Sequence, residues 1–175
     1  NTQSDQEQIE NPVWHIMNGE NSIGNVNVTY NLILNLVAAS GKNDPAIILD
    51  FVKKYDENIN SSNRQFINDL IKGAINFERD ITSEQINYKI PTSEERKIFE
   101  DLINRLRSQA ESADAETIQT EIYQIGKDHN FENLRDWFKL IYQVLFGKED
   151  GPRFGTFIAI YGIKQTIELI EEKLK

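Results

Sequence analysis

From Val26 to the end of the chain, apolar residues recur every three or four positions almost without interruption. This spacing places them on one face of a helix, which turns once every 3.6 residues or so. The first of these stripes is apolar on a second face as well and stops before Gly41, so it predicts a helix that is buried nearly all round. Its members are Tyr30, Leu32, Ile33, Leu34, Leu36 and Val37.

Further helical stripes follow the first one along the chain. Their first apolar residues are Ile47, Phe66, Ile98, Ile118, Leu134, Phe157 and Ile163. A strand would instead alternate apolar and polar residues, and no segment of the sequence sustains that alternation. The pattern therefore predicts an all-α fold of seven to eight helices that form a cage or bundle.

Several of these helices carry recognisable start and stop residues. Asp44 can cap the N-terminus of the second helix, and Pro45 occupies the first turn, where its missing N–H is not needed. Thr92, with Glu95 three residues later, makes a capping box. Gly147 ends the helix that begins near Leu134, since glycine readily adopts the left-handed conformation that closes a helix. The boundaries of these helices are thus predicted from local sequence.

Two segments interrupt the helical pattern and divide the chain. Residues 1–25 are polar and irregular, which is typical of a linker. Residues 80–91 look like a connection and close on a proline, which disfavours helix at the residue before it. We therefore expect a first helical subdomain over 26–91 and a second over 92–175, with the boundary near residue 91.

Charge and composition limit the classes of function. The chain has 19 basic and 28 acidic residues and a net charge of −9, whereas nucleic-acid-binding domains usually present a basic footprint. An RNA role would need a local basic surface, or another domain that makes most of the phosphate contacts. Cysteine is absent, which excludes disulfides and thiol nucleophiles and fits a reducing, cytoplasmic location. No run of about 18 apolar residues is present, which argues against a membrane span.

We find no residues that would form a catalytic or metal site. The only histidines are His15 and His129, too few for a histidine-based metal site unless carboxylates complete it. Asp128 and His129 could act as a ligand or acid–base pair, but they also fit a helix C-terminus, where histidine interacts well with the helix dipole. Phosphate-binding glycine loops are missing as well. The sequence predicts no catalytic residue, no metal ligand and no cofactor in this chain.

The best candidate for a binding loop is Gly151-Pro-Arg-Phe-Gly155. It is a tight turn in which Arg153 projects near the start of a helix, and such a place can bind a phosphate. It can equally be a structural turn whose glycines allow close packing. Trp14 and His15 form a second candidate, because no helical stripe explains their burial. This pair either fastens the linker to the helices or offers a stacking surface.

Two stretches resemble one known family. Asn11-Pro-Val-Trp-His-Ile-Met-Asn-Gly19, followed by Tyr30-Asn-Leu-Ile-Leu-Asn-Leu-Val37, is similar to the start of the helical domain of class I lysyl-tRNA synthetases. Gly151-Pro-Arg-Phe-Gly-Thr-Phe-Ile-Ala-Ile-Tyr-Gly162 is similar to the C-terminal signature of that family. The spacing between the two also fits, so the resemblance covers about residues 11–175.

This resemblance implies that the chain is one part of a longer enzyme. Such an enzyme joins lysine to its tRNA with ATP, and with magnesium, in a Rossmann-type catalytic domain whose signatures resemble HIGH and KMSKS. Neither signature occurs in this sequence. The chain would then be the helical cage that receives the anticodon loop, with residues 1–25 as the linker from the catalytic domain. Alone it should be inactive and hold no cofactor, and its partners should be lysine tRNA and that catalytic domain, not DNA or a membrane.

The resemblance and the chemistry together select candidate RNA contacts. They are Gly151, Arg153, Phe154, Trp14 and His15. The alternatives are a helical protein–protein interaction domain, which the acidic balance favours, and the equivalent module of a glutamyl-type synthetase. A concentrated basic surface near Arg153 would support RNA, whereas an exposed apolar groove would support a partner helix.

Overall fold

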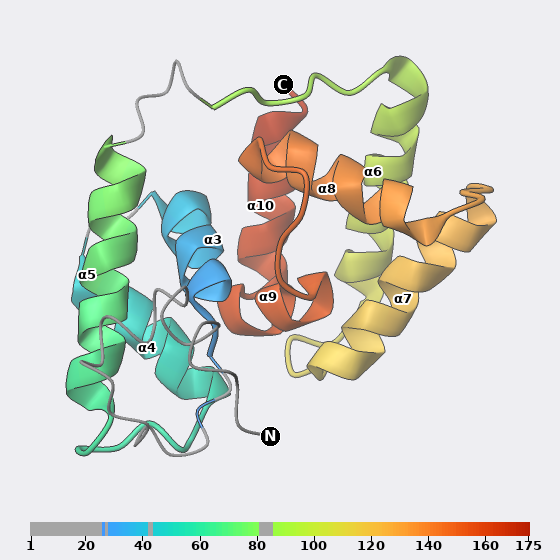
Figure 1. Ribbon diagram of the computed structural model, residues 1–175. Coiled ribbons are helices and arrows are strands. Elements are labelled where there is room, and N and C mark those ends of the chain that lie inside the picture. Colours follow the sequence, from blue (N-terminus) through green and yellow to red (C-terminus); the bar gives the residue numbers. More distant parts are fainter. Residues whose placement is uncertain (1–25, 27, 42–43, 81–85) are drawn as a thin grey trace, which may run out of the picture.

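A computed structural model of the protein describes residues 26, 28–41, 44–80 and 86–175, and every regular element in these ranges is a helix (Figure 1). The expected all-α fold of seven to eight helices is confirmed, since the described residues form eight. They are α3 (Tyr30–Ser40), α4 (Pro45–Tyr55), α5 (Arg64–Asp80), α6 (Ser93–Ser108), α7 (Ala115–Asp128), α8 (Leu134–Phe146), α9 (Phe154–Tyr161) and α10 (Ile163–Lys173). None of these helices is long and apolar enough to cross a membrane.

The helix boundaries follow the local signals in the sequence. The Asp44 carboxylate accepts a hydrogen bond from the backbone N–H of Ala46 at 2.9 Å. Thr92 and Glu95 form both bonds of the expected capping box, with the Glu95 N–H donating to the threonine hydroxyl at 3.2 Å and the Glu95 carboxylate accepting from the Thr92 N–H at 2.8 Å. Gly147 is left-handed, with φ of 65°, where α8 stops. These three predictions are confirmed.

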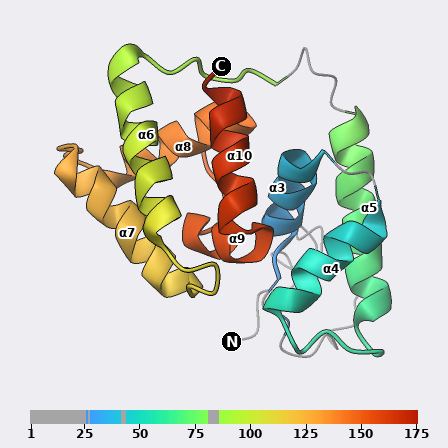
Figure 2. The same cartoon turned by 180° about the vertical axis from the view of Figure 1, so that it is seen from behind.

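The helices gather into two groups joined by the connection that ends at residue 92 (Figure 1). α3, α4 and α5 pack on one another, while α6, α7, α8 and α10 form the second group. Viewed from behind, α6 and α10 run side by side in the second group (Figure 2). The connection itself is held to α8, because the Lys89 N–H donates to the Gln143 carbonyl at 3.0 Å. The boundary near residue 91, as a division between subdomains, stays a prediction.

Helix α9 joins the two groups. It packs most extensively on α7 and also contacts α3, α4 and α10. Its Phe157 is fully buried, and the ring centroid of Phe157 lies 5.2 Å from that of Tyr161. Tyr161 in turn contacts Phe51 of α4 with a centroid separation of 5.8 Å and donates from its hydroxyl to the Ala39 carbonyl of α3 at 2.9 Å. Buried aromatic rings dominate core energetics, so α9 carries much of the core shared by both groups.

Trp137 lies in the core of the second group, as its position on an apolar stripe predicts. Its side chain is 0% exposed, and its indole N–H donates to the Ile122 carbonyl at 3.0 Å. Gly126 lets α7 approach this ring closely, since a Cβ at that position would lie 2.8 Å from Trp137 Cδ1. This close contact brings α7 and α8 together, and both helices line a cleft on the surface.

Candidate functional site

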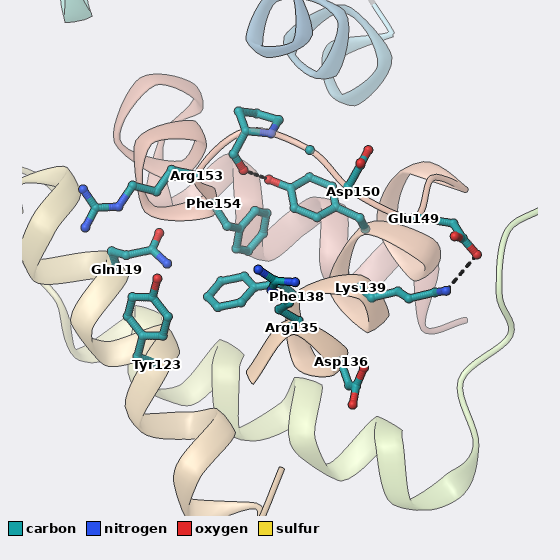
Figure 3. A pocket seen from close by; sticks show the side chains of 13 residues that line it. Gln119, Tyr123, Arg135, Asp136, Phe138, Lys139, Glu149, Asp150, Arg153 and Phe154 are labelled. Atoms are coloured by element: carbon teal, nitrogen blue, oxygen red, sulfur yellow. Dashed lines mark hydrogen bonds and ion pairs between the residues drawn. The ribbon is translucent and has the colours of Figure 1, made fainter. Parts of the chain in front are cut away.

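The cleft lies where α7, α8 and the turn before α9 meet, and it has a volume of about 410 Å³ (Figure 3). This volume falls in the range of ligand-binding pockets. α7 contributes Gln119 and Tyr123, α8 contributes Phe138 and Tyr142 among others, and the turn contributes residues 149–154. The cleft therefore unites three segments that are separate in sequence.

Two aromatic rings line one end of the cleft. Tyr123 is 39% exposed, and Phe138 is half-buried. The two rings meet edge to face, with centroids 5.2 Å apart and an interplanar angle of 75°. Figure 3 shows both side chains reaching into the cleft from their separate helices. Phe138 packs against the hydrophobic core with part of its ring, and the part that stays exposed lines the cleft and offers an aromatic face to a ligand.

The turn on the other side is held in place by Tyr142. The hydroxyl of this buried residue donates to the Pro152 carbonyl, and burial, with a smaller effect of the Asp150 charge, raises the pKa of the phenol well above its ordinary value. A Cβ at Gly151 would overlap the Tyr142 ring. Gly151 is therefore required for close packing of the turn.

Gln119 lies on the α7 wall of the cleft and is 2% exposed. Its Oε1 accepts a hydrogen bond from the backbone N–H of Gly155 at 2.7 Å. Its Nε2 has no hydrogen-bond partner among the described residues. Every fully buried side-chain nitrogen or oxygen of these residues does have a partner. The Nε2 atom is therefore not fully buried, and the open space beside Gln119 is the cleft. The bond to Gly155 fixes which end of the amide faces the cleft, because a backbone N–H can be accepted only by the oxygen.

Arg153 lies at the N-terminus of α9, as expected, and its side chain forms an ion pair. Its guanidinium lies 2.7 Å from the Glu116 carboxylate of α7, and the two side chains are 48% and 72% exposed. Lys139 forms a similar pair with Glu149 at 2.8 Å. Exposed ion pairs of this kind contribute roughly 0–1 kcal/mol. An anionic ligand could therefore displace these acidic partners at modest cost.

The charges that line the cleft are balanced. Three basic residues line it, Arg135, Lys139 and Arg153, and so do three acidic residues, Asp136, Glu149 and Asp150. The cleft is thus not a concentrated basic surface. Any recognition of a polyanion here depends on ring stacking and directed hydrogen bonds more than on net charge.

The five candidate RNA contacts selected from the sequence differ in where they lie. Gly151 and Arg153 lie at the cleft. Phe154 also borders the cleft, but it is 0% exposed and stacked on Phe157 with ring centroids 5.6 Å apart, so it forms part of the buried floor. Trp14 and His15 lie outside the described residues.

His129 lies at the C-terminus of a helix, as one of the two interpretations of Asp128 and His129 predicts. It is the C-cap of α7, and its Nε2 lies 3.0 Å from Asp101 of α6. In the part of the chain that the structure describes, no three His, Asp or Glu residues gather in a way that could hold a metal ion.

The residues that sequence reasoning missed are those that only the packing of helices brings together. They are Gln119, Tyr123, Arg135 and Lys139. The sequence does contain one signal for Tyr123, because this aromatic residue lies off the apolar stripe of α7. It also follows Gln119 by four positions, and residues at this spacing share a helix face.

Comparison with known proteins supplies an independent line of evidence. The chain is 38% identical over 168 residues to a lysine–tRNA ligase of Rickettsia bellii, 37% identical to that of Rickettsia felis and 35% identical to that of Rickettsia conorii. These matches cover 95% of the chain but 32% of each relative, so the chain spans about a third of the length of the curated relatives it matches. No family model matches the chain, and no solved structure does. The chain is homologous to one region of lysine–tRNA ligases.

Proposed function

We propose that this chain, homologous to one region of lysine–tRNA ligases, is the helical module with which such an enzyme binds the anticodon loop of lysine tRNA. The observation that carries the proposal is the match to these ligases over 95% of the chain. The complete class I enzyme would attach lysine to tRNA with ATP and magnesium in a separate catalytic domain, in the cytoplasm. This module would then bind RNA without itself performing chemistry.

The cleft supplies what recognition of a loop needs. Unpaired bases are bound by splaying them onto aromatic or guanidinium planes and by hydrogen bonds to their edges. Tyr123 and Phe138 present aromatic surface, and Arg135 and Arg153 flank the same cleft. The lysine anticodon ends in two uridines, and each stacked base contributes about 1–3 kcal/mol. Stacking gives affinity for any base, so discrimination between loops would come from hydrogen bonds to the base edges.

The acidic balance of the chain is compatible with this role if phosphate contacts are few. At most three basic residues line the cleft, so the slope of log K against log salt for a single strand should be no steeper than roughly −2. The catalytic domain would provide the remaining phosphate contacts. A strong, steep salt dependence would point to a different, basic surface.

The decisive experiment is a titration of the full chain with the anticodon stem–loop of lysine tRNA at low and moderate salt. Tyr123→Ala should weaken binding by about 5- to 150-fold, which corresponds to the loss of one stacked base. Tyr88→Ala is the matched control, because Tyr88 is 38% exposed against 39% for Tyr123 but lies outside the cleft. Arg153→Ala should weaken binding as well, by a smaller factor.

Other outcomes would favour the other interpretations. Tighter binding to a glutamate anticodon loop would indicate a glutamyl-type module. No binding to any loop at low salt, or equal effects of Tyr123→Ala and Tyr88→Ala, would overturn the proposed site. A helical protein–protein module, which the net charge of −9 favours, would then be the better explanation.

A further inference from the structure

We infer that Gln119 is a specificity-determining residue of this cleft, which selects a nucleobase with a carbonyl at its edge, such as uracil, over one with an amino group, such as cytosine. The inference rests on the proposed RNA-binding function. It goes beyond that function because neither the sequence patterns nor the comparisons point to Gln119.

The first step is that the amide of Gln119 has one fixed orientation. A glutamine side chain can usually turn over and present either its oxygen or its nitrogen to a ligand. Here Oε1 is engaged by the Gly155 N–H at 2.7 Å, and the turned-over amide would place two N–H donors against each other. Gln119 is 2% exposed, which leaves little room for another rotamer. The cleft therefore meets the NH₂ end of the amide.

The second step is the packing that holds this orientation. A Cβ at Gly155 would lie 2.5 Å from the Ala115 carbonyl oxygen and 2.7 Å from the Gln119 Cβ. α9 can approach α7 this closely only because residue 155 is glycine. The Gly155–Gln119 bond is thus built into the contact between two helices and does not depend on a mobile loop.

The third step is the location of the Nε2 donor relative to the aromatic surface. Gln119 and Tyr123 share a face of α7 at a spacing of four residues, and the Phe138 ring of α8 lies beside them, in contact with Tyr123 (Figure 3). A base stacked on one of these rings would bring its edge toward Gln119. Uracil presents the acceptor O4 at that edge, whereas cytosine presents an N4 amino group, which would face the Nε2 donor with a second donor. A donor left unsatisfied at a nearly buried site costs enough to reject the wrong base.

The test compares three anticodon loops that differ at one position, carrying uracil, cytosine or 2-pyrimidinone, which has neither O4 nor N4. Each is titrated at pH 8 against the wild-type chain and against Gln119→Glu. In this variant the carboxylate can still accept from the Gly155 N–H but has no donor for the base. The wild type should bind the uracil loop at least about fivefold more tightly than the cytosine loop, with 2-pyrimidinone between them. Gln119→Glu should abolish or reverse that ratio, whatever its effect on overall affinity.

The loop series on the wild-type chain keeps the test valid even if Gln119→Glu unfolds. Equal affinity for uracil, 2-pyrimidinone and cytosine at every loop position, with Tyr123→Ala still weakening binding, would overturn the role of Gln119 and leave the proposed function standing. The same conclusion follows if folded Gln119→Glu keeps the wild-type preference for uracil. Absence of RNA binding by the wild-type chain would overturn both.

Discussion

The guanidinium of Arg153 lies 2.7 Å from the carboxylate of Glu116, and this ion pair links the start of α9 to the first turn of α7. Glu116 also lies where a carboxylate favours the positive end of the α7 dipole. Arg153 therefore already has an anionic partner, and an RNA phosphate would have to replace it. Glu116 is the residue whose charge most directly opposes the proposed use of Arg153.

Glu116→Gln should consequently strengthen binding of the anticodon loop. Removing the carboxylate frees Arg153 and removes a repulsive charge, and we expect about two- to fivefold tighter binding at low salt, consistent with an exposed pair worth roughly 0–1 kcal/mol. Glu57→Gln, an exposed change in the other helix group, serves as the control for net charge. If both variants gain equally, only the overall charge matters and the Arg153 pair has no special role.

Gly155→Ala should destabilise the protein by about 1–3 kcal/mol, because the new methyl group meets backbone atoms that cannot move independently. Gly73→Ala is the matched control within α5, since its Cβ would meet only the Tyr30 hydroxyl, at 3.9 Å. That change should be neutral or stabilise by about 0.5–1 kcal/mol, the ordinary gain of alanine over glycine in a helix. Urea unfolding of the three proteins measures both effects. A Gly155→Ala protein as stable as wild type would show that α7 and α9 are not tightly packed in solution.

The capping box of α6 should make stability depend on pH in the acid range. Burial disfavours the charge of Glu95, but hydrogen bonds from Lys89 and from the Thr92 backbone outweigh it, so the pKa of Glu95 is lowered in the folded protein. A lowered folded-state pKa adds stability that is present above the ordinary glutamate value of about 4.3 and is lost as pH falls through the folded value.

Glu95→Gln keeps a side-chain acceptor at its place in the capping box but loses the charge that pairs with Lys89. It should therefore cost roughly 0–1 kcal/mol at neutral pH, and the difference from wild type should shrink as pH falls below about 4.3. Unfolding free energies measured from pH 7 to pH 3 test this. Glu94→Gln, one residue away and exposed, should show a smaller and flatter difference. A Glu95→Gln deficit that persists unchanged at pH 3 would mean that the side chain acts through packing and not through its charge.

Tyr161→Phe tests the coupling between the two helix groups. The change removes only the hydroxyl that donates to the Ala39 carbonyl at 2.9 Å, and it should cost about 0.5–1.5 kcal/mol. Because the ring contacts between α9 and α4 remain, unfolding should stay a single transition. Tyr88→Phe, at an exposed site, is the control. Two separate transitions in either protein would show that residues 26–91 and 92–175 are independent subdomains.

Much of the fold was predictable because the relevant signals are local. The residues that cap or close the helices, such as Asp44, Thr92 and Gly147, act on neighbours within a few positions. The apolar period of the helix that begins at Leu134 likewise puts Trp137, three positions later, on the buried face. Such signals depend on the geometry of one helix and not on how helices are arranged.

The candidate site was only partly predictable, since it depends on packing between elements. Arg153 stood out as a cation beside a tight turn, and it does border the cleft. Phe154 follows it in the same turn, and only the stacking on Phe157 shows that it points inward. Gln119 looks like an ordinary polar residue of an amphipathic helix until the close approach of Gly155 turns its amide into a fixed donor.

The central position of α9 has a consequence for how the chain is made. Tyr161 donates to Ala39, a partner 122 positions earlier. At a synthesis rate of roughly 5–20 residues per second, this partner is translated roughly 6–24 s before Tyr161. During that interval the ribosome-bound chain has produced α3, α4 and then α5, but not α9, which contacts both α3 and α4. The nascent protein thus passes through a period in which the surfaces of α3 and α4 that α9 later covers are open to chaperones and proteases.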